Sequence, residues 1–174
     1  MQRWQKVTQR YAFRGWRSML IKTFRLPDGS VRDYDILENG AYVVVAAFTT
    51  GREAILVRQF RPGPERFVSS FCEGYIDSGE SPGQAAAREL LEETGYRAGS
   101  ISYLRTIHSA YTTEDRICLL ATDCEFVGMT KGDDDEFLAV STLPLADFLE
   151  MVAQDASNFS SLDAAFLALR ALGW

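Results

Sequence analysis

The sequence has little histidine and cysteine, and this restricts the metal chemistry open to it. A single histidine, His108, and three cysteines, Cys72, Cys118 and Cys124, are spread over 174 residues. Zinc sites usually need four Cys or His ligands at close spacing, and the sequence has no such cluster. The odd number of cysteines argues against a disulfide framework and favours a reducing compartment. We therefore expect free, buried thiols and no zinc site.

Long hydrophobic runs and an excess of basic residues are also missing. The longest apolar run, Ala41 to Phe48, is too short to span a bilayer, and Met1 to Arg17 has no apolar stretch of signal-peptide length. Eighteen Lys and Arg against 24 Asp and Glu give a net charge of -6, which disfavours binding to phosphate backbones. These absences predict a cytoplasmic protein that has neither a membrane nor a nucleic acid as a partner.

The apolar content, 47% of the residues, is enough for a folded domain with a core. Ser18 to Arg25 and Val31 to Ile36 alternate around a Pro-Asp-Gly-Ser turn and predict a β-hairpin. Ala41 to Phe48 predicts a strand buried on both faces, and Glu53 to Gln59 predicts the strand that returns beside it. Further strands are expected at Phe67 to Phe71, Ile101 to Ile107, Ile117 to Cys124 and Phe137 to Val140.

Helices are expected at Ser81 to Thr94, Pro144 to Ala153 and Ser161 to Leu172. The first has the clearest signals, because Ser81 and Gln84 form a capping box and Gly95 follows the last turn. Strands interleaved with three helices predict an α/β or α+β sandwich, in which helices cover both faces of a mixed sheet.

Three glutamates, Glu89, Glu92 and Glu93, fall on one face of the first helix. Like charges at this spacing repel by a few tenths of a kcal/mol each, so we expect a positive partner against this face. Mg²⁺ is commonly held by a few carboxylates, water and substrate phosphates. From the spacing alone, a solvated acidic surface is the alternative. Ala86 and Leu90, with Ala87 beside them, are expected to pack the other face.

The segment around these glutamates has a specific pattern: Gly74, five residues, Glu80, seven residues, and then Arg-Glu-Leu-Leu-Glu-Glu-Thr-Gly-Tyr from Arg88 to Tyr96. It resembles the Nudix box at each fixed position. The resemblance implies a Nudix-type α/β/α sandwich and Mg²⁺- or Mn²⁺-dependent hydrolysis of a nucleoside diphosphate linked to another group. It implies site residues as follows: Glu89, Glu92 and Glu93 as metal ligands, the last two also catalytic, Glu80 as a further carboxylate, Arg88 orienting the glutamates and Gly74 shaping the metal site.

Residues outside the box resemble the branch of ADP-ribose and nucleotide-sugar pyrophosphatases. A strand that ends in Gln-x-Arg precedes the box, and in that branch an arginine near the position of Arg61 contacts a substrate phosphate. Arg58 is a second candidate for this contact, and the alternative for both is a charged strand end. Phe-Cys-Glu-Gly, ending at Gly74, replaces the branch's usual Leu-Pro-Ala-Gly.

A second feature of the branch is a loop after the box that carries a glutamate. Glu114 matches this glutamate, and the resemblance implies that it acts as catalytic base or as a metal-linked carboxylate. The loop differs from the branch in one place, because Ser-Ala stands where the branch has Pro-Gly. Asp115 is an alternative base, and so is His108, for which a structural role is the commoner one. Tyr111 is expected to stack on a base or ribose, with packing as the alternative.

The N-terminal segment carries Trp4, Tyr11, Phe13 and Trp16, which the minimal Nudix fold does not need. We expect residues 1–40 to form an antiparallel β-hairpin extension of a Nudix domain at 41–174. In the resembled branch such strands help to form a homodimer and clamp the nucleotide base, which makes Trp16 a candidate substrate contact. A small satellite core is the alternative. The run from Asp133 to Glu136 is expected to be a solvated turn rather than a metal site.

These expectations converge on hydrolysis of the pyrophosphate bond in a nucleoside diphosphate sugar. ADP-ribose is the first candidate, and the products would be a nucleoside monophosphate and a sugar phosphate. Two alternatives are a hydrolase of nucleoside di- or triphosphates or other nucleotide conjugates, and a Nudix module that binds nucleotides without turnover. A pure binder has no need of three clustered carboxylates that repel one another.

Overall fold

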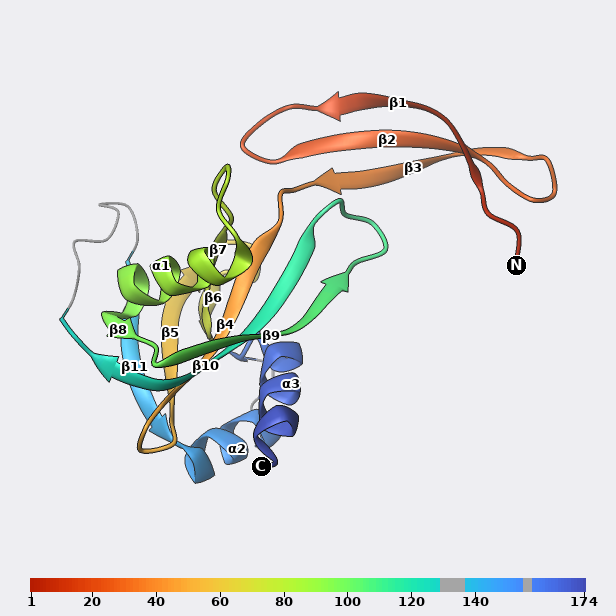
Figure 1. Cartoon of the computed structure of the whole chain (residues 1–174). Coiled ribbons are helices and arrows are strands. Elements are labelled where there is room, and N and C mark those ends of the chain that lie inside the picture. Colours follow the sequence, from red (N-terminus) through yellow and green to blue (C-terminus); the bar gives the residue numbers. More distant parts are fainter. Residues whose placement is uncertain (129–136, 155–157) are drawn as a thin grey trace. The chain divides into compact units, whose positions relative to one another are not determined.

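The computed structural model describes residues 1–128, 137–154 and 158–174. The predicted acidic turn from Asp133 to Glu136 lies outside these residues. Figure 1 shows the elements. The strands are β1 (Gln5–Phe13), β2 (Ser18–Arg25), β3 (Val31–Glu38), β4 (Tyr42–Thr49), β5 (Glu53–Arg61), β6 (Arg66–Ser70), β7 (Cys72–Tyr75), β8 (Tyr96–Arg97), β9 (Ser100–His108), β10 (Asp115–Phe126) and β11 (Ala139–Pro144), and the helices are α1 (Pro82–Thr94), α2 (Leu145–Gln154) and α3 (Leu162–Leu172).

The chain divides into two compact units. The first contains Met1–Ala41 together with Ile107–Asp115, and the second contains Tyr42–Thr106 together with Arg116–Trp174. The N-terminal unit is therefore discontinuous in sequence. The division expected at residue 40 did not include its second segment, Ile107–Asp115. The assignment of residues 1–40 as an extension of a domain at 41–174 stays a prediction.

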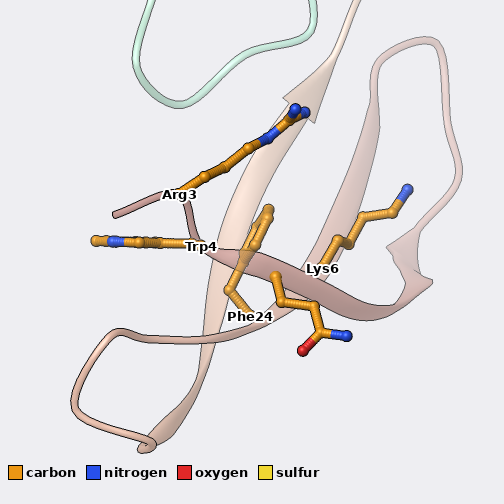
Figure 2. A pocket seen from close by; sticks show the side chains of 5 residues that line it. Arg3, Trp4, Lys6 and Phe24 are labelled. Carbon is orange, nitrogen blue, oxygen red and sulfur yellow. The ribbon is translucent and has the colours of Figure 1, made fainter. Parts of the chain in front are cut away.

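The N-terminal unit is built on an antiparallel sheet with the order β1-β2-β3. The predicted hairpin is confirmed, because β2 and β3 pair in register from Ser18 opposite Glu38 to Arg25 opposite Val31. β1 was not predicted, and it adds a third strand whose nine residues are all exposed. Trp4 packs against Tyr34 with ring centroids 5.5 Å apart and helps to line an open pocket with Phe24 (Figure 2).

The second unit contains a mixed sheet with the order β11-β5-β4-β10-β8, with β6 paired to β5, β7 to β4 and β9 to β10. β4 and β10 are parallel neighbours, and Val45 lies opposite Leu119. The expected hairpin between β4 and β5 is confirmed as an antiparallel pair at Phe48 and Ala54.

Helices cover both faces of this sheet, as predicted. Val43 and Val45 of β4 belong to a buried cluster with Leu90 of α1. The intervening residues of β4 face the other way, and there Phe48 contacts Phe148 of α2 with ring centroids 6.1 Å apart. The strand is therefore buried on both faces, and the result is the expected α/β/α sandwich (Figure 1).

Helix α1 begins and ends at the predicted signals. The Ser81 hydroxyl accepts a hydrogen bond from the backbone of Gln84, whose side chain accepts one from the Ser81 N–H at 2.9 Å. Gly95 has a φ of 75° and ends the helix by donating to the Leu91 carbonyl at 2.9 Å. These local contacts fix the rotation of the helix and hence the direction of its glutamates.

Two details of the sequence reading were wrong. Ala87 is exposed, and Ala85 lies in the buried face of α1 beside Ala86 and Leu90. The strand expected from Phe137 begins at Ala139 and continues to Pro144, so that α2 begins one residue later than predicted. The prediction that Ala86 and Leu90 pack the buried face of α1 is confirmed, and Ala85 takes the place expected for Ala87.

The three cysteines are free and buried, as expected. Burial raises the pKa of the Cys118 and Cys124 thiols to about 11, and it raises the pKa of Cys72 well above its usual value. These thiols are therefore protonated at neutral pH and act as core side chains. Among the described residues, no helix is long and apolar enough to cross a membrane.

Candidate active site

The Arg88 side chain of α1 lies among the carboxylates of the glutamate segment. Its Nε and Nη2 atoms donate to the two carboxylate oxygens of Glu80 at 3.1 and 3.0 Å, in a two-pronged contact. Its Nη1 atom donates to Glu89 at 2.7 Å and to Glu92 at 3.1 Å. The fork is completed by a bond from Nη2 to the Tyr75 carbonyl at 2.9 Å. A planar guanidinium is suited to such simultaneous contacts, and a lysine could not replace it.

This network sets the charge state of its members. The hydrogen bond from Arg88 lowers the pKa of the Glu80 carboxyl, and a bond from the Asp77 backbone lowers it further. In the other direction, the hydrogen bond to Glu80 raises the pKa of Arg88. Glu80 and Arg88 are consequently both charged at neutral pH. Arg88 thus brings a positive charge to the glutamates from the helix itself.

Strand β7 holds the other side of the cluster. The Glu73 backbone N–H donates to the Glu93 carboxylate at 3.3 Å. At the next residue, a Cβ atom placed on Gly74 would overlap the Glu89 carboxylate. Gly74 therefore leaves the space that Glu89 occupies, and this explains a glycine at that position without any need for unusual backbone angles.

The side chains of the cluster are suited to a hard divalent cation, because Glu80, Glu89, Glu92 and Glu93 offer oxygen atoms only. Glu80 and Glu89 are 15% and 13% exposed, so two of these carboxylates are largely shielded from water. In the described part of the chain, no group of three or more acidic, His or Cys side chains converges on one point. The guanidinium of Arg88 instead engages three of the four carboxylates in this arrangement. The set fits a cation in its donor chemistry and in its rigid support.

The two candidate phosphate-binding arginines lie on opposite faces of β5. Val57 belongs to the buried cluster on the α1 face, and strand alternation places Gln59 and Arg61 on that same face. Arg58 is exposed on the other face, where its guanidinium lies 5.5 Å from the ring centre of Phe67. The geometry therefore favours Arg61 over Arg58 as a residue on the side of the glutamates.

A second charged cluster in this unit was not predicted. Arg116 on β10 donates from Nε and Nη2 to Asp163 at 2.8 and 3.1 Å and pairs with Glu73 at 3.5 Å. Ser161 joins it by donating to Glu73 at 3.2 Å. Burial lowers the pKa of the Arg116 guanidinium. The charge of Glu73 and the hydrogen bonds to Tyr42 and Asp163 raise it by more, so that the pKa lies above its usual value.

This cluster connects the start of α3 to the residue that holds Glu93. Glu73 supplies the backbone N–H bonded to Glu93, while its side chain is engaged by Arg116 and Ser161. The partners are far apart in sequence and have no common motif. The single signal available was a charged residue, Arg116, directly before the apolar run from Ile117 to Ala121.

The remaining candidates belong to the N-terminal unit. Glu114 is half-buried and accepts a hydrogen bond from the Asn39 amide at 2.8 Å. The alternative bases pair with each other, because His108 Nδ1 lies 2.9 Å from Asp115 with both side chains largely exposed. Tyr111 and Trp16 are 62% and 94% exposed, and Trp16 lies in the connection between β1 and β2. Two of the three candidate bases are thus engaged by one another, and Glu114 is held separately.

Comparisons with known proteins show what this chain is similar to. An ADP-ribose pyrophosphatase of Bacillus subtilis is 31% identical over 77% of this chain and 74% of its own length. An ADP-sugar pyrophosphatase of Mus musculus is 34% identical over 63% of this chain and 54% of its own length. The crystal structure of an ADP compounds hydrolase superposes with a TM-score of 0.82 at 24% identity, covering 99% of this chain and 97% of that one.

The family model described as the NUDIX domain matches residues 37–162. This range includes the whole glutamate cluster, its Arg88 fork, the strand that ends at Arg61 and the segment that carries Glu114. With most of the chain matched by the model, this protein belongs to the NUDIX family of hydrolases.

Proposed function

We propose that this protein hydrolyses the pyrophosphate bond of a nucleoside diphosphate sugar, with ADP-ribose as the first candidate. The observation that carries the proposal is the arrangement of Glu80, Glu89 and Glu92 around Arg88 on a capped helix. The names of the similar proteins support ADP-linked substrates. The products would be a nucleoside monophosphate and a sugar phosphate.

The roles of the cluster follow from its chemistry. Glu89, Glu92 and Glu93, with Glu80, would hold Mg²⁺ or Mn²⁺, and Gly74 gives Glu89 the room to do so. When bound, such cations neutralise phosphate charge and lower the pKa of an attacking water. Arg88 orients Glu80, Glu89 and Glu92 through its hydrogen bonds, and the Glu73 N–H bonds to Glu93. Positioning of this kind is the contribution that the protein makes to phosphoryl transfer.

Substrate contacts come from residues outside the helix. We propose that Arg61 binds a phosphate, since a guanidinium can contact two phosphate oxygens at once, while Arg58 is a weaker candidate on the opposite face. Glu114 is proposed as the additional carboxylate that acts as a base or is linked to the metal. Tyr111 and Trp16 offer exposed rings on which a base or ribose can stack.

We further propose that the protein is a homodimer that pairs through its N-terminal sheet. β1 is an edge strand with all nine residues exposed. Its side chains and those next to it include Trp4, Tyr11, Phe13 and Trp16, each more than 40% exposed. Exposed edge strands with large apolar side chains are commonly covered by a partner. Light scattering coupled to size exclusion should give twice the 19.5 kDa mass of the chain.

The substrate proposal is tested by a turnover panel. Purified protein is given ADP-ribose, GDP-mannose, UDP-glucose and dNTPs with Mg²⁺, Mn²⁺ or a chelator. Phosphatase releases phosphate from the products of the three diphosphate sugars, and the dNTPs, which phosphatase itself would attack, are followed by chromatography without it. We expect turnover of ADP-ribose that a chelator abolishes, with sugar phosphate and AMP as products by chromatography. Faster turnover of the dNTPs would replace the proposal by a nucleoside triphosphate hydrolase, and binding without turnover of any compound would replace it by a nucleotide-binding module.

Replacing Gly74 by alanine is expected to lower kcat about 10- to 100-fold, the usual effect of disturbing a residue that supports a metal ligand. The added Cβ would overlap the Glu89 carboxylate and force it to move. Turnover of ADP-ribose and its dependence on Mg²⁺ concentration measure the effect.

The matched control is Gly83→Ala in the first turn of α1. A Cβ there meets nothing within 4 Å, and alanine favours the helix. Activity should stay near wild type while thermal stability rises slightly. Equal losses of activity in the two variants would contradict the role of Gly74.

A further inference from the structure

The loop that carries Glu114 is hydrogen-bonded to the end of β3. The Leu37 N–H donates to the Tyr111 carbonyl at 2.9 Å, and the Thr113 N–H donates to the Leu37 carbonyl at 3.0 Å. These two bonds form a short parallel bridge between Leu37 and Thr112. The loop and the N-terminal sheet therefore belong to one compact unit.

Asn39, just after β3, completes this attachment with three polar contacts. Its backbone N–H donates to Thr113 Oγ1 at 3.0 Å, and Thr113 Oγ1 donates to the Asn39 carbonyl at 3.0 Å. Its side-chain Nδ2 donates to Glu114 Oε2 at 2.8 Å. The amide must present its NH₂ group to the carboxylate, because two oxygens facing each other would repel.

The contact is of a kind that restrains a side chain. An amide donor to a carboxylate is a charge-assisted hydrogen bond, and both residues are half-buried. A glutamate without such a partner samples many rotamers, and ordering it for the reaction costs side-chain entropy. The neighbouring acid Asp115 is directed instead to His108. Asn39 thus restrains Glu114 in particular.

We propose that Asn39 is a positioning residue that fixes the Glu114 carboxylate for the reaction. The proposal rests on the proposed function, in which Glu114 supplies a catalytic carboxylate. Asn39 itself acts through Glu114 and needs no contact with the substrate. The end of the N-terminal sheet thereby sets the geometry of a carboxylate on a loop 75 residues further along the chain.

The test compares Asn39→Ala, Asn39→Asp, Glu114→Gln and the double variant Asn39→Ala with Glu114→Gln. Asn39→Ala should lower kcat for ADP-ribose about 10- to 100-fold, with KM and thermal stability little changed. Asn39→Asp should lower kcat further, because it places a negative charge against Glu114. In the Glu114→Gln background, Asn39→Ala should have almost no further effect.

A purely structural role makes different predictions. The near-isosteric Asp would then disturb less than Ala, and the effects of Asn39→Ala and Glu114→Gln would multiply. Either result, or an unchanged kcat in Asn39→Ala, would overturn the proposal. The control is Thr23→Ala, which removes a 2.6 Å hydrogen bond to Asp33 in the same sheet and should leave kcat unchanged.

Amide hydrogen exchange separates this proposal from the proposed function. Peptides that cover residues 107–115 should exchange faster in Asn39→Asp, while peptides of α1 should not. Absence of turnover of every diphosphate sugar in the wild-type protein would remove the proposed function and with it the positioning role of Asn39. Normal wild-type turnover with unchanged Asn39 variants would remove only the positioning role.

Discussion

Glu93→Gln is expected to lower kcat for ADP-ribose by about 10²- to 10⁴-fold, the range typical for loss of a group that acts on the reacting atoms. The neutral amide loses the charge with which Glu93 would hold a cation. It keeps an oxygen that can accept the 3.3 Å hydrogen bond from the Glu73 N–H. The fold should therefore survive, and the loss should appear in turnover and in Mg²⁺ dependence, both measured by phosphate release.

The control for this variant is Glu150→Gln on α2, outside the box. Glu150 accepts a hydrogen bond from Gln154 at 2.9 Å on the surface. The Glu150→Gln variant should keep both kcat and the melting temperature near wild type. Glu92→Gln should resemble Glu93→Gln. If both box variants kept full activity and metal dependence, the assignment of catalysis to this helix would be wrong.

Arg116→Met is expected to lower the free energy of unfolding by about 3–5 kcal/mol, the usual cost of removing one partner from a buried ion network. The Arg116 side chain is 15% exposed and lies between Glu73, which is 16% exposed, and Asp163. Methionine fills a similar volume but leaves two carboxylates without their positive partner. Urea unfolding followed by circular dichroism measures the change.

Arg10→Met provides the comparison on the surface. Arg10 pairs with Asp33 at 3.3 Å, but these side chains are 59% and 53% exposed. Exposed pairs contribute about 0–1 kcal/mol, so this variant should unfold near the wild-type midpoint. Similar losses in the two variants would show that the Arg116 cluster contributes no more than a surface pair. Raised salt should weaken the Arg10 pair and leave the Arg116 effect largely intact.

The parts of the fold that could be predicted are those specified by neighbouring residues. Ser81, Pro82, Gln84 and Gly95 define α1 through contacts within a few residues, and the structure reproduces them. The hairpin of β2 and β3 was readable because its turn and its alternation are both local. Glu89, Glu92 and Glu93 were found for the same reason, since helical spacing alone places them on one face.

The missed parts depend on contacts that the sequence order does not reveal. β1 is exposed along its length, so it has no buried face to give an alternating pattern. The partners of Arg116 come from three other elements, and Ser161 lies 88 residues from Glu73. Asn39 belongs to no recognisable motif either, although it contacts Glu114, which the family resemblance had already indicated. Long-range pairing of polar side chains is thus what the sequence reading lacked.

The discontinuous N-terminal unit imposes an order on folding during synthesis. β1, β2 and β3 leave the ribosome before the second unit, but the segment that bonds to Leu37 and Asn39 ends only at residue 115. Domains synthesised first usually fold first. Here the first sheet can pair its strands early, yet its contacts with the 107–115 segment must wait until α1 and most of the second sheet have been made.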